Sequence, residues 1–261
     1  MVTAQQVKEL RERTWVGMSD CKNALVEANG DMDQAIDILR KKGLAKAAKR
    51  AGNETTEGKI KIVIDGSSAY VAVVSCETDF VSRSEAYEEM LSRFIEIRKS
   101  AASDEAAIVV AEELKASEYT LKVGENLVIK TLTKIDGAVL ASYVHSNFKQ
   151  ASLVIGNDAA NADILKQVAM HVVAASPEFL SPADVSLEVL AKEKEIALAQ
   201  MQEDPKNAGK PQDILEKIID GKMKKFAEEN ALLTQPFVIN PDQKVQDIAG
   251  NTITAFYKFA I

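Results

Sequence analysis

The feature that most constrains the fold is a change in the period of the apolar residues near residue 59. Upstream of it, apolar side chains recur every three or four positions, which is the period of an amphipathic α-helix. Downstream, Ile60, Ile62 and Ile64 occupy every second position, which is the period of a β-strand. A helical segment is therefore followed by sheet-forming chain, and we expect an α+β protein.

The segment before residue 59 carries the start and stop signals of three short helices. A Ser, Thr or Asp side chain caps a helix by accepting a hydrogen bond from a first-turn N–H, and Gly or Asn ends one because it tolerates the left-handed conformation. The expected caps are Thr3 (with Gln6), Ser19 and Asp31 (with Gln34), and the expected ends are Gly17, Asn29-Gly30 and Gly43. This part is predicted to form a compact three-helix bundle.

A strand–turn–strand–helix plan follows. Asp65-Gly66 predicts a turn between strands at 59–64 and 69–76. Ser82 with Glu85 forms a capping-box pattern that predicts the start of a helix. The apolar faces expected here are Tyr87, Met90, Leu91, Phe94 and Ile95 on that helix, and Ala107, Ile108, Ala111 and Leu114 on a shorter one.

A similar plan then recurs farther along the chain. The expected elements are strands at 127–135 and 138–145 around a turn at Asp136-Gly137, a strand at 151–155, and a helix capped by Asn161. We interpret the two copies as an internal structural repeat.

The last third is organised differently, because all six prolines lie at or beyond Pro177. Ser181-Pro182 predicts a helix start with proline in the first position. The apolar positions of this helix are Val185, Val189, Ile196 and Ala199, and those of the next are Ile214, Leu215, Ile218, Ile219, Met223 and Phe226. Turn-forming residues at 203–213 join the two, so we expect an antiparallel helical hairpin, followed by strands at 237–239 and 252–259.

Charge and composition limit the classes of function. The net charge of −7 disfavours a general nucleic-acid binder, whose surface must neutralise phosphates. The basic stretch at 40–50 leaves nucleic-acid binding as an alternative, but no aromatic residue interleaves there to stack on bases, so a solvated helical connector is favoured. No apolar run approaches the ~18 residues of a membrane span. The two cysteines, Cys21 and Cys76, are expected as reduced thiols in a cytoplasmic protein.

The most informative local segment is Cys76-Glu77-Thr78-Asp79-Phe80-Val81. It lies between the end of a strand and a helix, where a rigid scaffold presents a short loop. An aromatic residue beside a carboxylate in such a loop suits a wedge that enters a pocket of a partner. From the residues alone, however, a core position for Phe80, covering the helix start, is favoured.

Catalytic interpretations have little support. Cys76 with His145 or His171 offers a nucleophile and a base for a hydrolase or transferase, but no glycine-rich elbow or third orienting group accompanies them. His171 is better interpreted as a structural histidine with its hydrogen bonds satisfied. The chain has no G-x-x-x-x-G-K-[ST] loop and no clustered His/Cys spacing, so we expect no bound nucleotide, cofactor or metal.

Several strings, in order along nearly the whole chain, resemble the bacterial elongation factor Ts family. They are L-RERT-x-x-GM-S-DCKNAL-x-EANGD-x-x-x-AI at 10–36, TDFV at 78–81, Tyr143-Val144-His145, VAMHVVAASPEFLSPADVS at 168–186, GKMKKF and QPFV. This resemblance carries the expectation of function, which composition and period alone do not reach.

The resemblance implies a ubiquitin-associated-like three-helix domain at 1–52, with the basic connector. It implies two related α+β core subdomains with antiparallel sheets, at 53–138 and at 139–180 with 230–261, and an inserted coiled-coil hairpin at 181–229. The implied activity is non-catalytic: a cytoplasmic guanine-nucleotide exchange factor that binds elongation factor Tu, both GDP-bound and nucleotide-free, and promotes GDP release. No membrane and no direct nucleic-acid partner is expected.

Carried over residue by residue, the resemblance assigns roles. Asp79 and Phe80, between Thr78 and Val81, would be the pair that intrudes near the partner's magnesium site, and His145 would assist. The residues implied in N-terminal docking are Leu10, Arg11, Thr14, Gly17 and Met18.

Three features depart from the family pattern. Trp15-Val16 stands where Gly-Ala is common, and an exposed Trp15 would either join the interface or pack on the bundle. After His145 the glycine- and arginine-bearing segment is replaced by Ser-Asn-Phe-Lys-Gln-Ala-Ser, one residue longer, which changes the expected geometry of that loop. Many members continue past the final strand with a further helix, so contacts made by that helix are not assumed for this chain.

Overall fold

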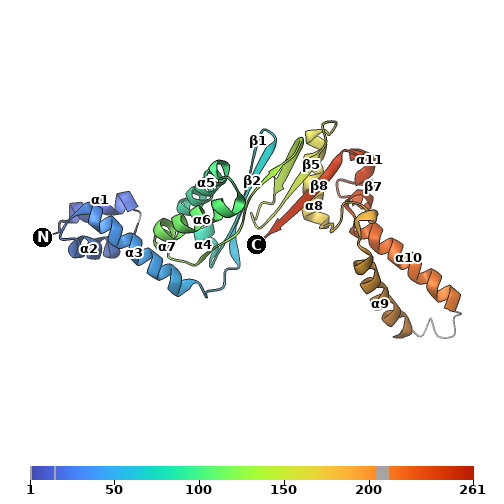
Figure 1. Cartoon of the computed structure of the whole chain (residues 1–261), viewed down its shortest axis with the longest axis horizontal. Helices are drawn as coiled ribbons and strands as arrows, with labels where there is room; N and C mark the ends of the chain where they lie inside the picture. The colour runs from blue at the N-terminus through green and yellow to red at the C-terminus, as the bar shows by residue number, and fades with distance from the viewer. Residues whose placement is uncertain (1, 15, 204–211) are drawn as a thin grey trace. The chain divides into compact units, whose positions relative to one another are not determined.

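The computed structural model describes residues 2–14, 16–203 and 212–261 and confirms an α+β fold (Figure 1). The chain divides into two compact units. The first comprises Met1–Asp136, Val144–Ala151 and Phe259–Ile261, and the second comprises Gly137–Tyr143 and Ser152–Lys258. Among the described helices, none has the length and apolar character needed to span a bilayer.

The first unit opens with helices α1 (Ala4–Thr14), α2 (Met18–Glu27) and α3 (Met32–Arg50). Two of the expected caps are confirmed by their hydrogen bonds. The Gln6 N–H donates to Thr3 Oγ1 at 3.2 Å, and the Gln34 N–H donates to Asp31 Oδ1 at 2.9 Å. Asn29 and Gly30 have φ of 51° and 88°, so α2 ends in the left-handed conformation, as expected. The bundle core includes Leu10, Cys21 and Leu25.

Two of the expected boundaries in this bundle are wrong. Gly17, not Ser19, holds the N-cap position of α2, and Ser19 lies in the first turn. Gly43 does not end α3, which continues to Arg50. A Cβ at Gly43 would lie 3.0 Å from the carbonyl oxygen of Ala116 and 3.1 Å from the Leu121 side chain, so the glycine serves a close packing contact.

Residues 40–50 are helical and mostly exposed, as a solvated connector is expected to be. Two of their basic side chains are paired with acids of α2. Lys42 Nζ lies 2.7 Å from Glu27 Oε2, and Lys46 Nζ lies 3.1 Å from Asp20 Oδ2. This pairing reduces the positive charge available to a phosphate backbone and counts against the nucleic-acid alternative.

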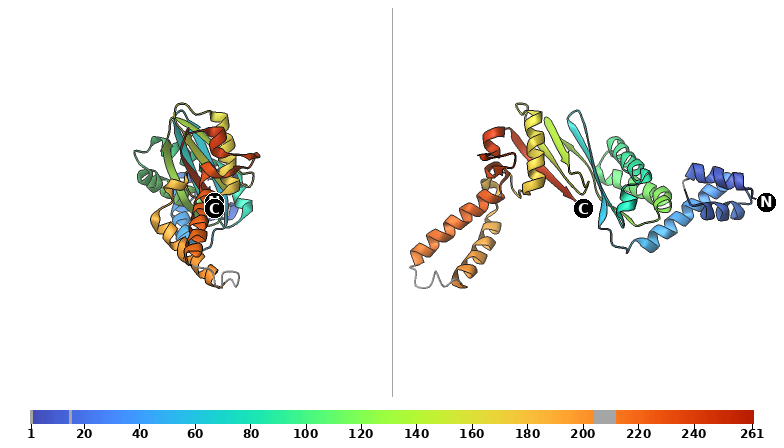
Figure 2. Two further views of the ribbon diagram at one scale, coloured as in Figure 1. Left: turned by 90° about the vertical axis from the view of Figure 1, so that its right-hand side faces the viewer. Right: turned by 180° about the vertical axis from the view of Figure 1, so that it is seen from behind.

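The first sheet has the order β1-β2-β3 and is antiparallel throughout. Its strands are β1 (Glu57–Asp65), β2 (Ser68–Cys76) and β3 (Leu127–Asp136). One face is covered by α4 (Asp79–Ser82), α5 (Glu85–Ser100), α6 (Asp104–Leu114), a π-helical turn (Lys115–Tyr119) and α7 (Thr120–Val123) (Figures 1 and 2). The expected apolar face of α5 is buried in the core of this layer, and the other face of the sheet carries Ile60, Val71 and Val73.

The expected cap of α5 is shifted by two residues. Ser84, rather than Ser82, accepts the Tyr87 N–H, at 3.3 Å, and Ser82 ends the short helix α4. The capping-box pattern at Ser82 is misleading because a separate short helix, α4, lies directly before α5.

The second sheet has the order β4-β5-β8, with β4 (Val139–Val144), β5 (Gln150–Gly156) and β8 (Ile253–Ala260). The expected hairpin between residues 127–135 and 138–145 is therefore wrong, because β3 pairs with β2 and β4 with β5. Gly66, in the true β1–β2 turn, has a φ of 59°, whereas Gly137 is not among the described glycines with positive φ. Asp136-Gly137 thus links two sheets instead of closing a two-residue hairpin.

The rest of the second unit consists of α8 (Ala162–Ala175), the 3₁₀ turn Pro182–Asp184, α9 (Leu187–Glu203), α10 (Gln212–Asn230), the 3₁₀ turn Leu232–Thr234, β6 (Pro236–Phe237), β7 (Asn240–Lys244) and α11 (Val245–Ala249). Asn161 caps α8 as expected. Helices α9 and α10 form the expected antiparallel hairpin (Figure 1). The expected turn at 203–213 lies largely outside the described residues.

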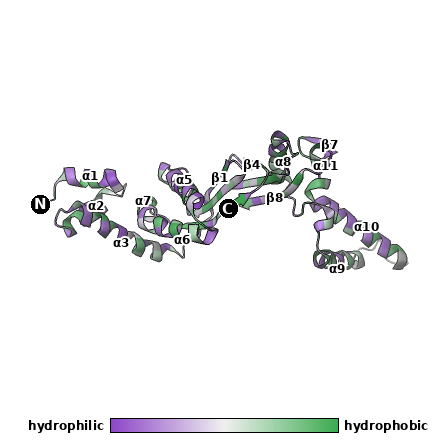
Figure 3. Cartoon of the chain, turned by 45° about the horizontal axis from the view of Figure 1, so that its top comes forward, coloured by the Kyte–Doolittle hydropathy of each residue, from purple (hydrophilic) through white to green (hydrophobic). Residues whose placement is uncertain are grey.

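The first helix of this hairpin differs from its expectation in two respects. Ser181-Pro182 begins a 3₁₀ turn, and the α-helix starts only at Leu187. Among the α9 side chains that the structure describes, the buried ones are Ala197 and Met201, whereas Ile196 is 42% exposed. Polar and apolar residues alternate closely along α9 and α10 in Figure 3, as expected for a helix pair with one narrow apolar seam.

Candidate functional site

The candidate site is built where β2 ends and α4 begins. Thr78 has an extended backbone, with φ −126° and ψ 155°, and its hydroxyl oxygen accepts the Val81 N–H at 3.4 Å. Thr78 is therefore the N-cap of α4, the first turn of which carries Asp79 and Phe80.

Phe80 projects into solvent: its exposed fraction is 83%. The core position favoured for Phe80 from the residues alone is wrong, because Val81 packs against the core in its place. Successive residues on a helix point about 100° apart. Burial of Val81 therefore directs Phe80 outward. Asp79 Oδ2 lies 3.2 Å from Arg83 Nη2, in an exposed ion pair along the same helical turn.

A carboxylate from a distant part of the chain holds the loop before α4. The N–H groups of Glu77 and Thr78 donate to Glu125 Oε2 at 3.0 and 2.9 Å, and the Thr78 hydroxyl donates to Glu125 Oε1 at 2.5 Å. Glu125 lies between α7 and β3. Glu125 is not among the residues expected from the sequence, where its one local signal is an acidic residue directly after the helix-ending Gly124, which has a φ of 73°.

The Glu77 carboxylate in turn binds the segment that carries Glu125. Its Oε1 accepts the Asn126 N–H at 2.6 Å and the Asn53 side-chain amide at 3.0 Å. The Asn126 side chain in turn donates to the Asn53 carbonyl oxygen at 2.8 Å. The hydrogen bond from the Asn126 backbone, followed by that from Asn53, lowers the pKa of the Glu77 carboxyl, so Glu77 is an anion at neutral pH.

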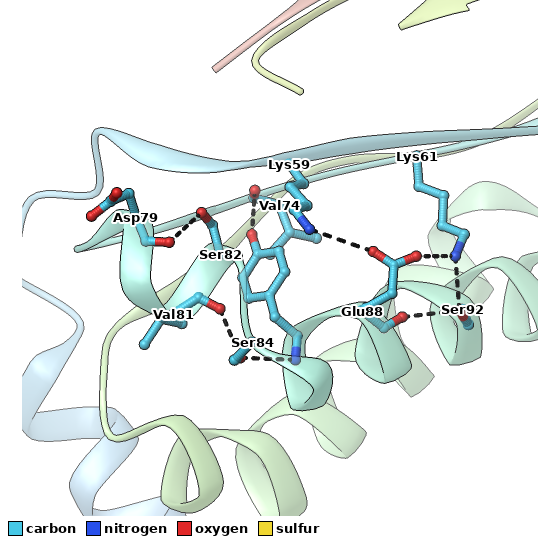
Figure 4. A network of polar contacts seen from close by, with 10 residues as sticks. Lys59, Lys61, Val74, Asp79, Val81, Ser82, Ser84, Glu88 and Ser92 are labelled. Atoms are coloured by element: carbon cyan, nitrogen blue, oxygen red, sulfur yellow. Dashed lines mark hydrogen bonds and ion pairs between the residues drawn. The ribbon is translucent and has the colours of Figure 1, made fainter. Parts of the chain in front are cut away.

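Polar contacts also hold α4 against the start of α5, and α5 against β1 (Figure 4). The Ser84 hydroxyl donates to the Val81 carbonyl oxygen at 2.7 Å. On α5, Glu88 accepts from Lys61 at 2.5 Å and lies 3.7 Å from Lys59 Nζ. The hydrogen bond from Lys61 lowers the pKa of Glu88.

A groove of about 570 Å³ lies beside α4. It is lined by Glu57, Gly58, Lys59, Asp79, Ser82, Arg83, Ser146, Asn147, Phe148 and Lys149. Phe148 is 46% exposed, and Lys59 Nζ lies 4.9 Å from the centre of its ring. The groove therefore combines an aromatic face with lysine and arginine side chains.

His145 directly precedes the segment that lines this groove. The His145 N–H donates to the Gln150 carbonyl oxygen, and the Phe148 N–H donates to the His145 carbonyl oxygen, both at 2.8 Å. Phe148 has a φ of 59°, a left-handed conformation that is uncommon for an aromatic residue. The longer loop after His145 thus forms a defined turn, and it brings residues 146–149 beside Asp79.

The structure counts against the catalytic alternatives, because the Cys76 thiol is not placed to act as a nucleophile. Cys76 is fully buried, and its thiol donates to the Thr78 carbonyl oxygen at 3.2 Å. Burial raises the pKa of this thiol to about 11, so it is protonated at neutral pH and is a poor nucleophile. His171 is buried, with both ring nitrogens hydrogen-bonded, which confirms its structural interpretation. Within the described residues, no group of three or more acidic, His or Cys side chains is placed to hold a metal ion.

The residues implied in N-terminal docking lie on α1 and α2. Leu10 is fully buried in the bundle core, and the Thr14 hydroxyl donates to its carbonyl oxygen at 2.7 Å. Arg11, Gly17 and Met18 are exposed. Leu10 therefore shapes the bundle, and the exposed residues form its surface. Trp15 lies outside the described residues.

A family model and the curated relatives point to the same protein family. A family model described as Elongation factor TS matches residues 77–261. The chain is 41% identical over 267 residues to the protein named Elongation factor Ts of Marinobacter nauticus, with all of this chain and 91% of that relative covered. It is 39% identical over 264 residues to Elongation factor Ts of Erwinia tasmaniensis, and 38% to that of Salmonella paratyphi A, each with the same coverage.

Proposed function

This chain belongs to the elongation factor Ts family, and we propose that it is the guanine-nucleotide exchange factor that binds elongation factor Tu and promotes release of GDP. As a member of that family it is an elongation factor of protein biosynthesis. It performs no covalent chemistry in this role, and it acts in the cytoplasm on both the GDP-bound and the nucleotide-free partner.

The observation that carries the proposal is the exposure of Phe80 on a capped and braced turn. An aromatic ring exposed to 83% has no role in the core of this chain, and a large apolar side chain held rigidly in solvent is the usual anchor of a protein interface. In this role Phe80, with Asp79 beside it, enters between helices of the partner near its magnesium site.

Linkage explains how such a wedge releases GDP without catalysis. If the factor binds the nucleotide-free partner more tightly than the GDP form, the same coupling free energy must weaken GDP binding. Magnesium and the N–H groups at a helix N-terminus hold the pyrophosphate by charge and orientation. Small displacements of those groups therefore cost binding free energy.

The rest of the chain supplies docking surfaces. The bundle α1–α3 would be the ubiquitin-associated-like domain of residues 1–52, and its exposed Arg11, Gly17 and Met18, with Thr14 and the supporting Leu10, would contact the nucleotide-binding domain of the partner. His145, which lies in the first compact unit, would assist. Helices α9 and α10 would be the coiled-coil insertion of residues 181–229.

Release of labelled GDP from the cognate elongation factor Tu tests the proposal, with wild type compared with Phe80→Ala. Removing the ring loses on the order of 2 kcal/mol of free energy from burying Phe80 in the partner. If this free energy lowers the barrier to GDP release, its loss corresponds to roughly 30-fold slower release at saturating factor. Docking should be largely retained, because the N-terminal surface is intact.

Val109→Ala is the matched control, since Val109 is an exposed apolar residue on α6, at 59% exposure. It should stimulate release as wild type does. The proposal fails if wild type does not accelerate release, and the role of Phe80 fails if Phe80→Ala releases GDP at the wild-type rate.

A further inference from the structure

We propose that Glu125 is a positioning residue for nucleotide exchange: its carboxylate fixes the loop that sets the direction in which Phe80 projects. The inference rests on the proposed function. It adds a residue that makes no contact with the partner in this role and acts through the loop of Glu77 and Thr78.

One carboxylate accepts three hydrogen bonds from two adjacent residues. Glu125 Oε2 receives the N–H groups of Glu77 and Thr78 at 3.0 and 2.9 Å, and Oε1 receives the Thr78 hydroxyl at 2.5 Å. Hydrogen bonds to an ionised acceptor are shorter and stronger than neutral ones. Together the three contacts fix both the backbone and the side chain of Thr78.

Thr78 transmits this constraint to α4. Its hydroxyl proton points to Glu125, which leaves an oxygen lone pair to accept the Val81 N–H at 3.4 Å. Helix α4 has only four residues, too few to hold a helical shape without outside support. The orientation of its first turn therefore depends on the cap, and Phe80 lies in that turn.

The loop that carries Glu125 is itself anchored. The next residue, Asn126, is buried and bonds through its N–H to Glu77 Oε1 at 2.6 Å and through its side chain to the Asn53 carbonyl oxygen at 2.8 Å. Glu77 and Glu125 thus each hold the other's loop. We call this pair, with Thr78 and Asn126, the loop clamp.

The loop clamp matters more for geometry than for folding. Thr78 is exposed and Glu125 only half-buried, so these contacts exclude little water and add little to the stability of the core. A wedge displaces the helices of a partner only if its own base does not yield. When the loop clamp is loosened, Phe80 still contacts the partner. The turn that carries Phe80 then reorients in place of the partner's helices, so the binding free energy no longer deforms the nucleotide site.

Glu125→Gln in the full-length chain is the primary test. Glutamine keeps the size of the side chain, but its amide nitrogen cannot accept, so one oxygen remains for three donors. With the cognate elongation factor Tu loaded with labelled GDP, we expect the release rate at saturating factor to fall on the order of tenfold. The half-saturating concentration should change by less than about twofold, since the docking surfaces are untouched.

Glu113→Gln provides the matched control, because it removes the same charge from an exposed position on α6. It should leave both kinetic values at wild type. Thermal unfolding midpoints of the two variants should agree, which separates positioning from loss of fold. Faster hydrogen exchange at the amides of Glu77, Thr78 and Val81 in Glu125→Gln would report the loosened loop directly.

A double-mutant cycle with Thr78 tests the route of action. Thr78→Val removes the hydroxyl, and Thr78→Ser retains it and should release GDP at the wild-type rate. Because Glu125 and the Thr78 hydroxyl share one of the three hydrogen bonds, the loss in the double variant Glu125→Gln/Thr78→Val should be smaller than the product of the two single losses.

Three results overturn the inference: wild-type release by Glu125→Gln, multiplicative losses in the double variant, or a rate loss matched by an equal loss of folded protein. If wild type itself fails to accelerate release, the proposed function and this inference fall together; if wild type succeeds and Glu125→Gln equals it, only the inference falls.

Discussion

At the scale of single residues, His171 shows how a buried polar side chain fixes the packing of its surroundings. The Val238 N–H donates to His171 Nδ1 at 3.2 Å, so Nε2 carries the proton and donates to Gln235 Oε1 at 2.9 Å. Gln235 in turn donates to the Glu229 carbonyl oxygen at 2.8 Å. One neutral imidazole therefore connects α8 to the end of α10 and to the segment after β6.

This network makes the stability of the second unit sensitive to acid. Burial lowers the pKa of His171, against a smaller opposing effect of the Gln235 hydrogen bond. Unfolded histidine has a pKa of about 6.5, so the unfolded chain binds the extra proton first as pH falls. Stability is then lost from about pH 6.5 downward toward the folded pKa, by at most about 1.4 kcal/mol per pH unit.

His171→Gln should reduce this dependence, because glutamine does not titrate. The measurement is urea unfolding of wild type and variant from pH 7.5 to 5. Values at pH 7.5, where the imidazole is neutral in both states, give the offset caused by the substitution itself. Equal slopes below pH 6.5 in the two proteins would show that another group is responsible.

At the scale of elements, α3 is notable for its length. It runs through Gly43 from the bundle core to the contact with the π-helical turn Lys115–Tyr119 and α7. The missing side chain at Gly43 permits the approach of the Ala116 carbonyl oxygen. A residue that is unfavourable in a helix interior is here required by packing.

Gly43→Leu should therefore destabilise the protein even though leucine is a better helix former than glycine. Overpacking against a backbone oxygen and Leu121 costs about 1–3 kcal/mol, more than the gain in helix propensity of about 0.8 kcal/mol. The control is Gly221→Leu in α10, where nothing lies within 4 Å of an added Cβ. Denaturant midpoints should fall for Gly43→Leu and rise for Gly221→Leu; a rise for both would mean that the close contact does not matter.

At the scale of the whole molecule, each compact unit has an apolar core of its own. In the first, α5 packs Leu91 and Phe94 against the sheet, and in the second, α8 packs Leu165 and Val168 against residues of β5 and β8. Separate cores predict that unfolding is not a single all-or-none transition.

Core truncations should therefore act on one transition each. Leu91 and Leu165 are both fully buried, and replacing a buried leucine by alanine costs about 2–5 kcal/mol. Leu91→Ala should lower the transition of the first unit and leave the other in place, and Leu165→Ala should do the reverse. Differential scanning calorimetry separates the two; a single transition that both variants shift equally would contradict the prediction.

Features that depend on neighbours a few residues apart could be predicted from the amino-acid sequence. The caps at Thr3, Asp31 and Asn161 and the buried face of α5 are as expected, because a cap and a helical face are formed within one or two turns of chain. The motif TDFV in its family order also indicates Asp79 and Phe80 as candidate site residues.

Features that depend on which surfaces meet could not be predicted in this way. The pairing of β3 with β2, the passage of α3 through Gly43 and the exposure of Phe80 all follow from long-range packing. The contact between Thr78 and Glu125 spans 47 positions of sequence. Local patterns carry no information about such pairs, because the partner of a strand edge, a glycine or a loop N–H is chosen when distant segments collapse onto a common core.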